Sequence, residues 1–307
     1  MSGAAHPTGE QYEIRRGPFT ATVTEVGAGL RSFARGEWNV LDGFAAEEVC
    51  TGGRGQLLLP WPNRVDRGRY EWEDYEHHLA LTEPAQTNAI HGLVRWSNWT
   101  LVDRAEHSVA LALRLHAQPG WPWVLDLRVE YELDDEGLTV RVHARNCSAQ
   151  PCPYATGAHP YLTLGGDTID AAELTAPGTR YMTTDERQIP TGSQPVEGTP
   201  FDFTKPRAIG ATKLDTGFSD LRRDGDGLAR VTLSGARREV SLWLSESYPF
   251  LMLFTGDTLG QPARRRVGLG VEPMTAAPNA FNSGEGLITL ESAQQITTVW
   301  GIAASVR

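Results

Sequence analysis

A histidine and a glutamate each stand directly before a proline, and these are the side chains best suited to moving protons. The pairs are His159-Pro160 and Glu272-Pro273. Proline biases the preceding residue towards an extended backbone, so both side chains should be held stiffly. An imidazole exchanges protons near neutral pH, and burial raises the pKa of a carboxyl group towards the range of a general base. A simple strand entry at His159, and a buried salt bridge from Glu272 to an arginine such as Arg64, remain open alternatives.

Three further residues could assist such chemistry. His91 precedes Gly92, and a glycine allows a ligand to approach the backbone closely. Arg64 ends a loop stiffened by two prolines and could donate a fork of hydrogen bonds. Tyr161 offers an aromatic ring with a polar tip. A structural histidine in a turn and a solvated loop arginine are the corresponding structural interpretations.

Composition excludes several classes of function. Among 307 residues, 28 Lys and Arg stand against 38 Asp and Glu, and the formal net charge is −10. Such a charge repels a phosphate backbone, so nucleic acid is not an expected partner. We find no apolar run typical of a signal peptide or a membrane helix, so no membrane association is expected and a cytoplasmic protein is predicted. The three cysteines are an odd number and predict reduced thiols.

The common catalytic signatures are missing. The sequence contains no Gly-x-Ser-x-Gly elbow, Walker loop or His-Glu-x-x-His motif. His77 and His78 are adjacent on a predicted strand, so they point to opposite faces and cannot chelate one ion. A metal site is therefore not predicted.

Alternating apolar and polar residues predict the elements that position these side chains. Residues 124–146 are predicted to form a β-hairpin with one solvent-exposed face, because apolar and polar residues alternate along both strands and residues 134–137 supply a turn. Residues 108–116, 229–245 and 295–303 show the same pattern. The short apolar run at 249–255 predicts a strand buried on both faces.

Hairpins without intervening helices favour an all-β fold, a large antiparallel β-sandwich of two packed sheets. Residues 51–70 and 185–212, rich in Gly and Pro, are predicted loops. Neither resembles an interdomain linker, so residues 1–307 are predicted to form a single domain, with residues 1–16 as a loose N-terminal segment.

The segments around His91, His159 and Glu272, together with the loop before Arg64, resemble in their order the aldose 1-epimerase (galactose mutarotase) family. The similarity extends from about residue 17 to residue 302. Its most specific part is the closing stretch, which comprises Glu272-Pro273-Met274-Thr275, Pro278, Ala280-Phe281-Asn282 and a last strand containing Trp300. The resemblance implies a large β-sandwich of the galactose mutarotase type.

The resemblance also implies roles. His159 would be the general acid at the ring oxygen of a sugar, Glu272 the general base at the anomeric hydroxyl, and His91 a second imidazole near the ring oxygen. One base and one acid suffice to open a cyclic hemiacetal, so neither a cofactor nor a metal is needed. Candidates for binding the sugar are Arg64 and Asp215 through hydrogen bonds, and Tyr161, Trp61 and Trp96 through their rings. Without the resemblance, Asp215 reads as a turn or cap residue.

Departures from the family leave the substrate open. Many galactose-active members carry Asn before the acid histidine and Phe-Asn after the following tyrosine, whereas Ala158 and Leu162-Thr163 stand here. By family analogy, a loop with arginines at positions 54, 64, 67 and 69 borders the pocket, so an anionic sugar carrying phosphate or sulfonate is an alternative to a neutral one. A solvated loop would explain the same arginines.

Two other functions remain open: a noncatalytic carbohydrate-binding protein, and a glycoside hydrolase with Asp215 and Glu272 as its carboxylate pair. The expected partner is a small sugar, and a monomer or a weak homodimer fits equally well.

Overall fold

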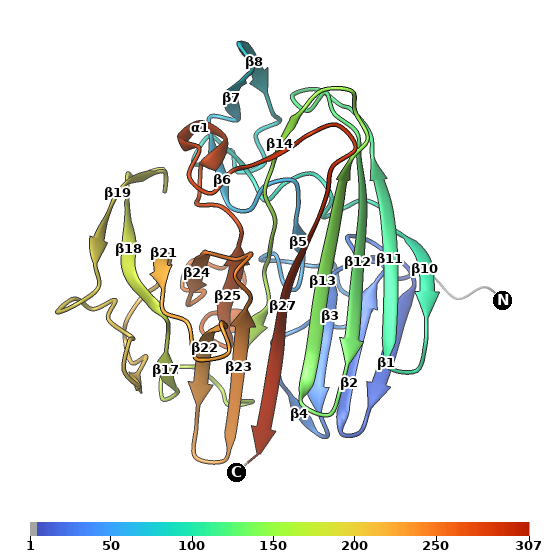
Figure 1. Cartoon of the computed structure of the whole chain (residues 1–307). Coiled ribbons are helices and arrows are strands. Elements are labelled where there is room, and N and C mark those ends of the chain that lie inside the picture. The colour runs from blue at the N-terminus through green and yellow to red at the C-terminus, as the bar shows by residue number, and fades with distance from the viewer. Residues whose placement is uncertain (1–4, 307) are drawn as a thin grey trace.

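A computed structural model of the chain describes residues 5–306, which form an almost entirely β structure (Figure 1). Its largest sheet has nine strands, and their order in space joins segments far apart in sequence. In that order, the strands are β10 (Thr100–Arg104), β11 (Ser108–Leu115), β12 (Leu125–Leu133), β13 (Gly137–Asn146), β27 (Gln295–Val306), β23 (Arg238–Leu244), β22 (Ala229–Ser234), β17 (Glu173–Thr175) and β20 (Arg207–Ala208).

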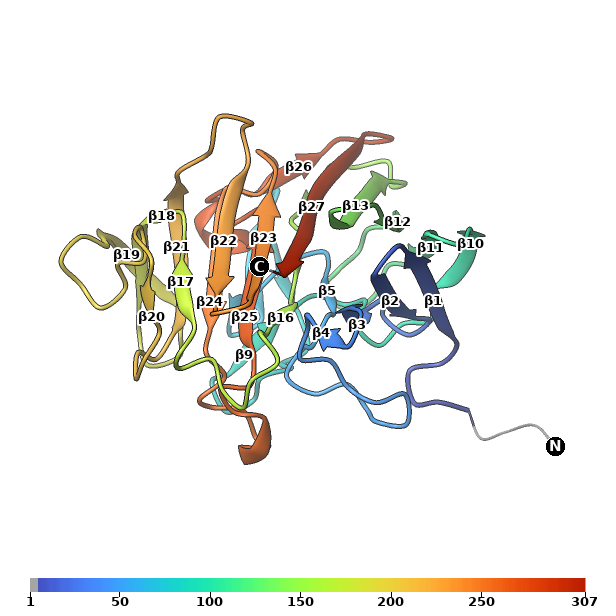
Figure 2. The same ribbon diagram turned by 90° about the horizontal axis from the view of Figure 1, so that it is seen from below.

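A second sheet, of eight strands, lies at the centre of the molecule. In order, the strands are β19 (Pro190–Pro195), β18 (Gly178–Thr184), β21 (Asp215–Leu221), β24 (Phe250–Phe254), β25 (Leu269–Met274), β15 (Gly157–Ala158) and β5 (Leu57–Leu58), with β16 (Tyr161–Leu162) also paired to β25. Every residue of β25 is buried, as are the first four of β24. Figure 2 shows β22 and β23 of the nine-stranded sheet in front of these two strands, and residues such as Leu242 and Val271 share one apolar cluster.

Smaller sheets and two short helices complete the fold. Four strands form one antiparallel sheet: β1 (Gln11–Arg16), β2 (Phe19–Thr24), β3 (Leu30–Arg35) and β4 (Trp38–Asn39). Three strand pairs are β6 (Arg64–Asp66) with β9 (Asn88–Ile90), β7 (Arg69–Trp72) with β8 (Tyr75–His78), and β14 (Cys152–Tyr154) with β26 (Ile288–Leu290). The helices are α1 (Ala280–Ser283) and a 3-10 turn at Pro262–Arg264.

The alternation in the sequence predicted the long strands well. In β12, every second residue from Leu125 to Leu133 is buried and the residues between are partly exposed. The hairpin of β12 and β13, the hairpin of β22 and β23, and the buried strand β24 all lie where their patterns place them. The predicted antiparallel sandwich is confirmed, and one apolar cluster joins its sheets through residues such as Val129, Leu242 and Val271.

Three predictions about irregular segments were wrong. Residues 11–16 are not loose, because β1 pairs along its whole length with β2 and buries Ile14; residues 1–4 of that predicted segment lie outside the described part. The predicted loop 51–70 contains β5, β6 and the start of β7, and the predicted loop 185–212 contains β19 and β20. Most of these strands are only two to four residues long, so no alternation marks them.

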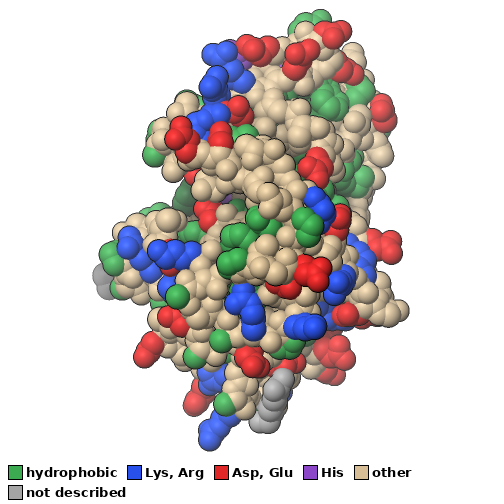
Figure 3. All heavy atoms as spheres, turned by 90° about the vertical axis from the view of Figure 1, so that its left-hand side faces the viewer, with side chains coloured by type: hydrophobic (Ala, Val, Ile, Leu, Met, Phe, Trp, Pro, Cys, Tyr) green, Lys and Arg blue, Asp and Glu red, His purple; other side chains and the backbone are tan. Residues whose placement is uncertain are grey.

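The surface carries charges of both signs. Figure 3 shows acidic and basic side chains interspersed over the face at the β18–β19 edge. Within residues 5–306, no helix has the length and apolar character needed to cross a membrane.

Candidate active site

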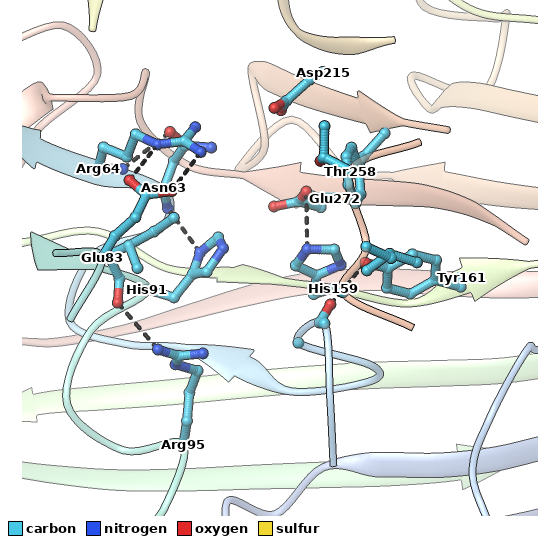
Figure 4. Close-up of a pocket in the computed structure, with 16 residues that line it drawn as sticks. Asn63, Arg64, Glu83, His91, Arg95, His159, Tyr161, Asp215, Thr258 and Glu272 are labelled. Carbon is cyan, nitrogen blue, oxygen red and sulfur yellow. Dashed lines mark hydrogen bonds and ion pairs between the residues drawn. The ribbon is translucent and has the colours of Figure 1, made fainter. Parts of the chain in front are cut away.

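A cavity of about 330 Å³ lies beside β24 and β25 and collects most of the side chains singled out in the sequence. His91, His159, Glu272, Arg64 and Asp215 all line it, although up to 208 positions separate them in the chain (272 minus 64). Tyr161 lines it as well, and Figure 4 shows these residues converging from different strands. The volume is at the lower end of the range for small-molecule sites, which is about 300–1,000 Å³.

Glu272 is placed by the buried strand β25. Its neighbour across the ladder is Met252 of β24, and its side chain is almost fully buried. One carboxylate oxygen, Oε2, has no hydrogen-bond partner among the described residues. Burial raises the pKa of Glu272 to about 8, with Asp215 adding to the rise and Arg64 opposing it. The expected upward shift of a desolvated carboxyl pKa is therefore present.

His159 sits between β15 and β16 with its backbone fixed on both sides. Its N–H donates to the carbonyl of Gln56 at 3.0 Å, and its own carbonyl accepts from the N–H of Gly55 at 2.9 Å. The ring lies parallel to Tyr161, with centroids 4.9 Å apart. Its Nε2 lies 3.2 Å from Oε1 of Glu272. Burial above all, with the nearby Arg95 and Arg54 also contributing, lowers the pKa of His159 to about 3.

The position of Tyr161 explains why the His159 ring is held so closely. The hydroxyl of Tyr161 donates to the carbonyl of Gly52 at 2.7 Å, and the Arg54 guanidinium lies over the tyrosine ring, 4.9 Å from its centroid. Gly53 also lies close to the imidazole: it has a φ of +73°, and a Cβ there would approach Cδ2 of His159 to 2.8 Å. The imidazole is thus packed closely against both an aromatic ring and a bare glycine backbone.

His91 presents a proton donor to the same cavity. The backbone N–H of Asn63 donates to Nδ1 of His91 at 3.2 Å, so in the neutral ring the proton is carried by Nε2. The ring meets that of His159 edge-on, with centroids 5.4 Å apart. Burial, followed by the charges of His159, Arg95 and Arg64, lowers the pKa of His91 well below its usual value.

Arg64 and Asp215 provide the polar wall opposite the histidines. Arg64 makes two hydrogen bonds of 2.8 Å to Glu83, so its buried charge is compensated by Glu83 and not by Glu272. Asp215 opens β21, and burial raises its pKa against the opposing effect of Arg64. Together these residues offer N–H donors and carboxylate acceptors suited to hydroxyl groups.

Two predictions about the surroundings of the site were wrong. Trp61 does not line the cavity, since it is buried against Phe281 with ring centroids 5.5 Å apart. Trp96 is exposed and lies outside it.

Of the four loop arginines, only the one at 64 lines the cavity. Arg54 lies behind it in a buried ion pair with Asp42 at 3.1 Å, and the arginines at 67 and 69 are exposed.

Sequence reasoning missed several lining residues. Glu83 stands directly before Pro84, as Glu272 stands before Pro273, and could have been noted on that ground. Arg95 stands four residues after His91 and could have been noted on that ground. Phe254 and Thr258 follow the buried run of β24 and complete the wall near Tyr161.

The three central side chains can do either of two things chemically. The donor atoms of His91, His159 and Glu272 all lie within 4.8 Å of one another, so this set could hold a transition-metal ion. Equally, a buried imidazole in contact with a buried carboxyl group forms a proton-transfer pair with separated pKa values.

Comparison with known proteins gives a consistent result. A family model described as aldose 1-epimerase matches residues 10–302. The uncharacterized protein YihR of Escherichia coli K12 is 32% identical over 288 residues, covering 94% of this chain and 91% of its own length. Human galactose mutarotase is 32% identical over 223 residues, covering 67% of this chain and 63% of its own length, so the match spans less than two thirds of that protein.

Solved structures share the fold. A GalM/aldose epimerase homologue from C. elegans superposes with a TM-score of 0.85 at 19% identity, covering 97% of this chain and 99% of its own. Galactose 1-epimerase from Lactobacillus acidophilus NCFM gives a TM-score of 0.79 at 19% identity, covering 97% and 98%.

Proposed function

The chain belongs to the aldose 1-epimerase family, whose members are isomerases acting on carbohydrates, and on this premise we propose that it interconverts the α and β anomers of a free aldose through His159 and Glu272. The observation that carries the proposal is the 3.2 Å contact between Nε2 of His159 and Oε1 of Glu272, inside a cavity with room for one pyranose ring. The two groups share a single proton in this proposal.

The shared proton explains how a buried pair can act as acid and base. The pKa of about 8 for Glu272 and of about 3 for His159 place the proton on the carboxyl group in the free site. Transfer along the short contact gives a carboxylate beside an imidazolium. The carboxylate then takes the proton of the anomeric hydroxyl while the imidazolium protonates the ring oxygen.

Ring opening and closure follow from the same groups. The C1–O5 bond breaks as C1 becomes an aldehyde, and O5 becomes a hydroxyl. Rotation about C1–C2 presents the other face of the carbonyl, and reversal of both proton transfers closes the ring. The Nε2–H of His91 donates to the ring oxygen, and Arg64 and Asp215 hold the remaining hydroxyls. Each positioned proton-transfer group contributes about 10²- to 10⁴-fold in rate.

Polarimetry of freshly dissolved α-glucose and α-galactose tests the proposal. We expect the wild type to accelerate the approach to equilibrium, and Glu272→Gln and His159→Gln to lose at least about 10²-fold in rate. A matched control is His143→Gln, because His143 lies on β13 away from the cavity. If the wild type leaves the spontaneous rate unchanged while binding sugar, a noncatalytic carbohydrate-binding protein is the better description.

The glycoside hydrolase alternative is less well supported. Its carboxylate pair would be Asp215 and Glu272, and it gives no task to the imidazole that touches Glu272. Release of nitrophenol from aryl glycosides would favour it.

We further propose that residues 1–307 form a single domain, since one apolar cluster runs through both large sheets.

A further inference from the structure

One cation in the cavity wall has no counterion. Arg95 lines the cavity but takes part in no ion pair among residues 5–306. Its N–H groups reach only neutral oxygens, the side-chain amide oxygen of Gln56 at 3.4 Å and the carbonyl of Ile90 at 3.3 Å. Its Nε is buried and has no partner among the described residues.

The arginines at 54 and 64 differ from Arg95 because each has a carboxylate partner. Arg64 is neutralised by two 2.8 Å hydrogen bonds to Glu83, and Arg54 by its buried pair with Asp42. Arg95 is partly buried, and a cation partly withdrawn from water is costly unless an anion compensates it. Burial accordingly lowers the pKa of Arg95. The chain therefore maintains an uncompensated guanidinium at the site where substrate would bind.

Arg95 also lies at a defined end of the cavity. Figure 4 shows it beside His91, on the side away from Asp215 and Glu272. Its charge acts on both histidines of the site, whereas Asp215 and Arg64 are the charged groups that act on Glu272. The cavity is thus cationic at the histidine end and carboxylate-rich at the other.

The order of atoms in a pyranose ring determines which carbon of the sugar lies nearest to Arg95. The ring oxygen is bonded to C1 on one side and to C5 on the other. With the anomeric hydroxyl at Glu272 and the ring oxygen at the histidines, the next group beyond the ring oxygen is the substituent on C5, which is C6. A group on C6 therefore extends towards Arg95.

We propose that Arg95 pairs with an acidic group on C6, so that the substrate class is an aldose bearing a carboxylate, phosphate or sulfonate at that position. This inference rests on the proposed epimerase function. A guanidinium presents a planar fork that matches all three anions, which share the chemistry of two or three acceptor oxygens. A neutral hydroxymethyl group would leave the cation uncompensated.

Binding of an anion to Arg95 would also help His159 to act as the general acid. Burial is the largest cause of the low pKa of His159, and Arg95 is among the charges that lower it further. Pairing Arg95 with an anion removes part of that effect, so the imidazolium form becomes easier to reach. The acidic substrate should therefore show a gain in kcat as well as a lower KM.

Anomer-exchange NMR on matched sugars tests the proposal. The panel is glucose, glucuronate, glucose 6-phosphate and 6-deoxy-6-sulfoglucose. We expect kcat/KM for at least one acid to exceed that for glucose by about 10²-fold, and we expect Arg95→Met to bring the ratio of these two values down to near one. Arg95→Lys should retain part of the preference, and Arg67→Met, at an exposed position outside the cavity, should retain all of it.

The outcomes separate this inference from the proposed function. Acceleration of glucose with no preference for any acid overturns the role of Arg95 and leaves the epimerase proposal standing, as does an equal loss on all sugars in Arg95→Met. Acceleration of no sugar at all overturns both.

Binding without turnover gives a second measurement. The best acid of the panel should raise the Tm of Glu272→Gln and have no such effect when Arg95→Met is added. An equal shift in both proteins contradicts the proposal.

Discussion

Replacing Glu272 by glutamine should stabilise the protein at alkaline pH while abolishing its activity. Glu272 is buried and its pKa in the folded protein is about 8, against an ordinary value of 4.5. The folded state therefore holds the proton more tightly than the unfolded chain does. The cost of burying the charge is absent below pH 4.5, grows between pH 4.5 and 8, and is complete above pH 8.

The size of the effect follows from the gap between the two pKa values. Each unit corresponds to about 1.4 kcal/mol, so a shift from 4.5 to about 8 costs the wild type on the order of 5 kcal/mol above pH 8 and roughly 3 kcal/mol at pH 7. Glutamine has the shape of the protonated carboxyl group, and its amide can still donate to Nε2 of His159.

Urea unfolding of both proteins at pH 5, 7 and 9 measures this difference. We expect the free energy of unfolding of Glu272→Gln to exceed that of the wild type by an amount that increases with pH. Glu246→Gln is a suitable control, because Glu246 is an exposed carboxylate outside the cavity and should give no such trend. A difference that stays constant within about 1 kcal/mol from pH 5 to pH 9 would refute the idea that Glu272 is held protonated by burial.

Three further outcomes follow from the same geometry. Above pH 8, kcat/KM should decline as Glu272 loses the only proton of the pair, and a stopped-flow or NMR pH profile with no such decline would contradict proton sharing. Gly53→Ala should lower kcat and cost about 1–2 kcal/mol more in stability than Gly36→Ala, because both glycines have a positive φ but only the first would contact His159; equal losses would count against close packing of Gly53 on the imidazole. In the native protein, a thiol reagent should modify Cys147 alone, since the other two cysteines are buried; mass spectrometry showing rapid labelling elsewhere would contradict this.

The sequence predicted the strands that have one buried and one solvent-exposed face. Strand β12 separates a buried face from a wet face, so its sequence alternates and its position could be read directly. The two-residue strand β5 is buried at both positions and is fixed by its partner β15, which lies 99 residues later (157 minus 58). Such a strand has no local pattern, because the cause of its structure is distant in the chain.

The same distinction applies to the cavity. His159 and Glu272 stand before prolines and could be singled out from the sequence, and both line the cavity. Trp61 was misassigned because an aromatic ring beside Arg64 suits a sugar as well as a core, and only its packing on Phe281 decides between them. The importance of Arg95 depends on a missing counterion, which is a property of the folded neighbourhood and not of the segment.

The central claim is that His159 and Glu272 act as one unit through a shared proton. It is tested most directly by the anomer-exchange rates of Glu272→Gln, His159→Gln and the double variant on one sugar. Residues that act as a unit lose their effect together, so the double variant should be no more than about threefold slower than the slower single variant. Losses that multiply, or a single variant that retains the wild-type rate, would contradict the account.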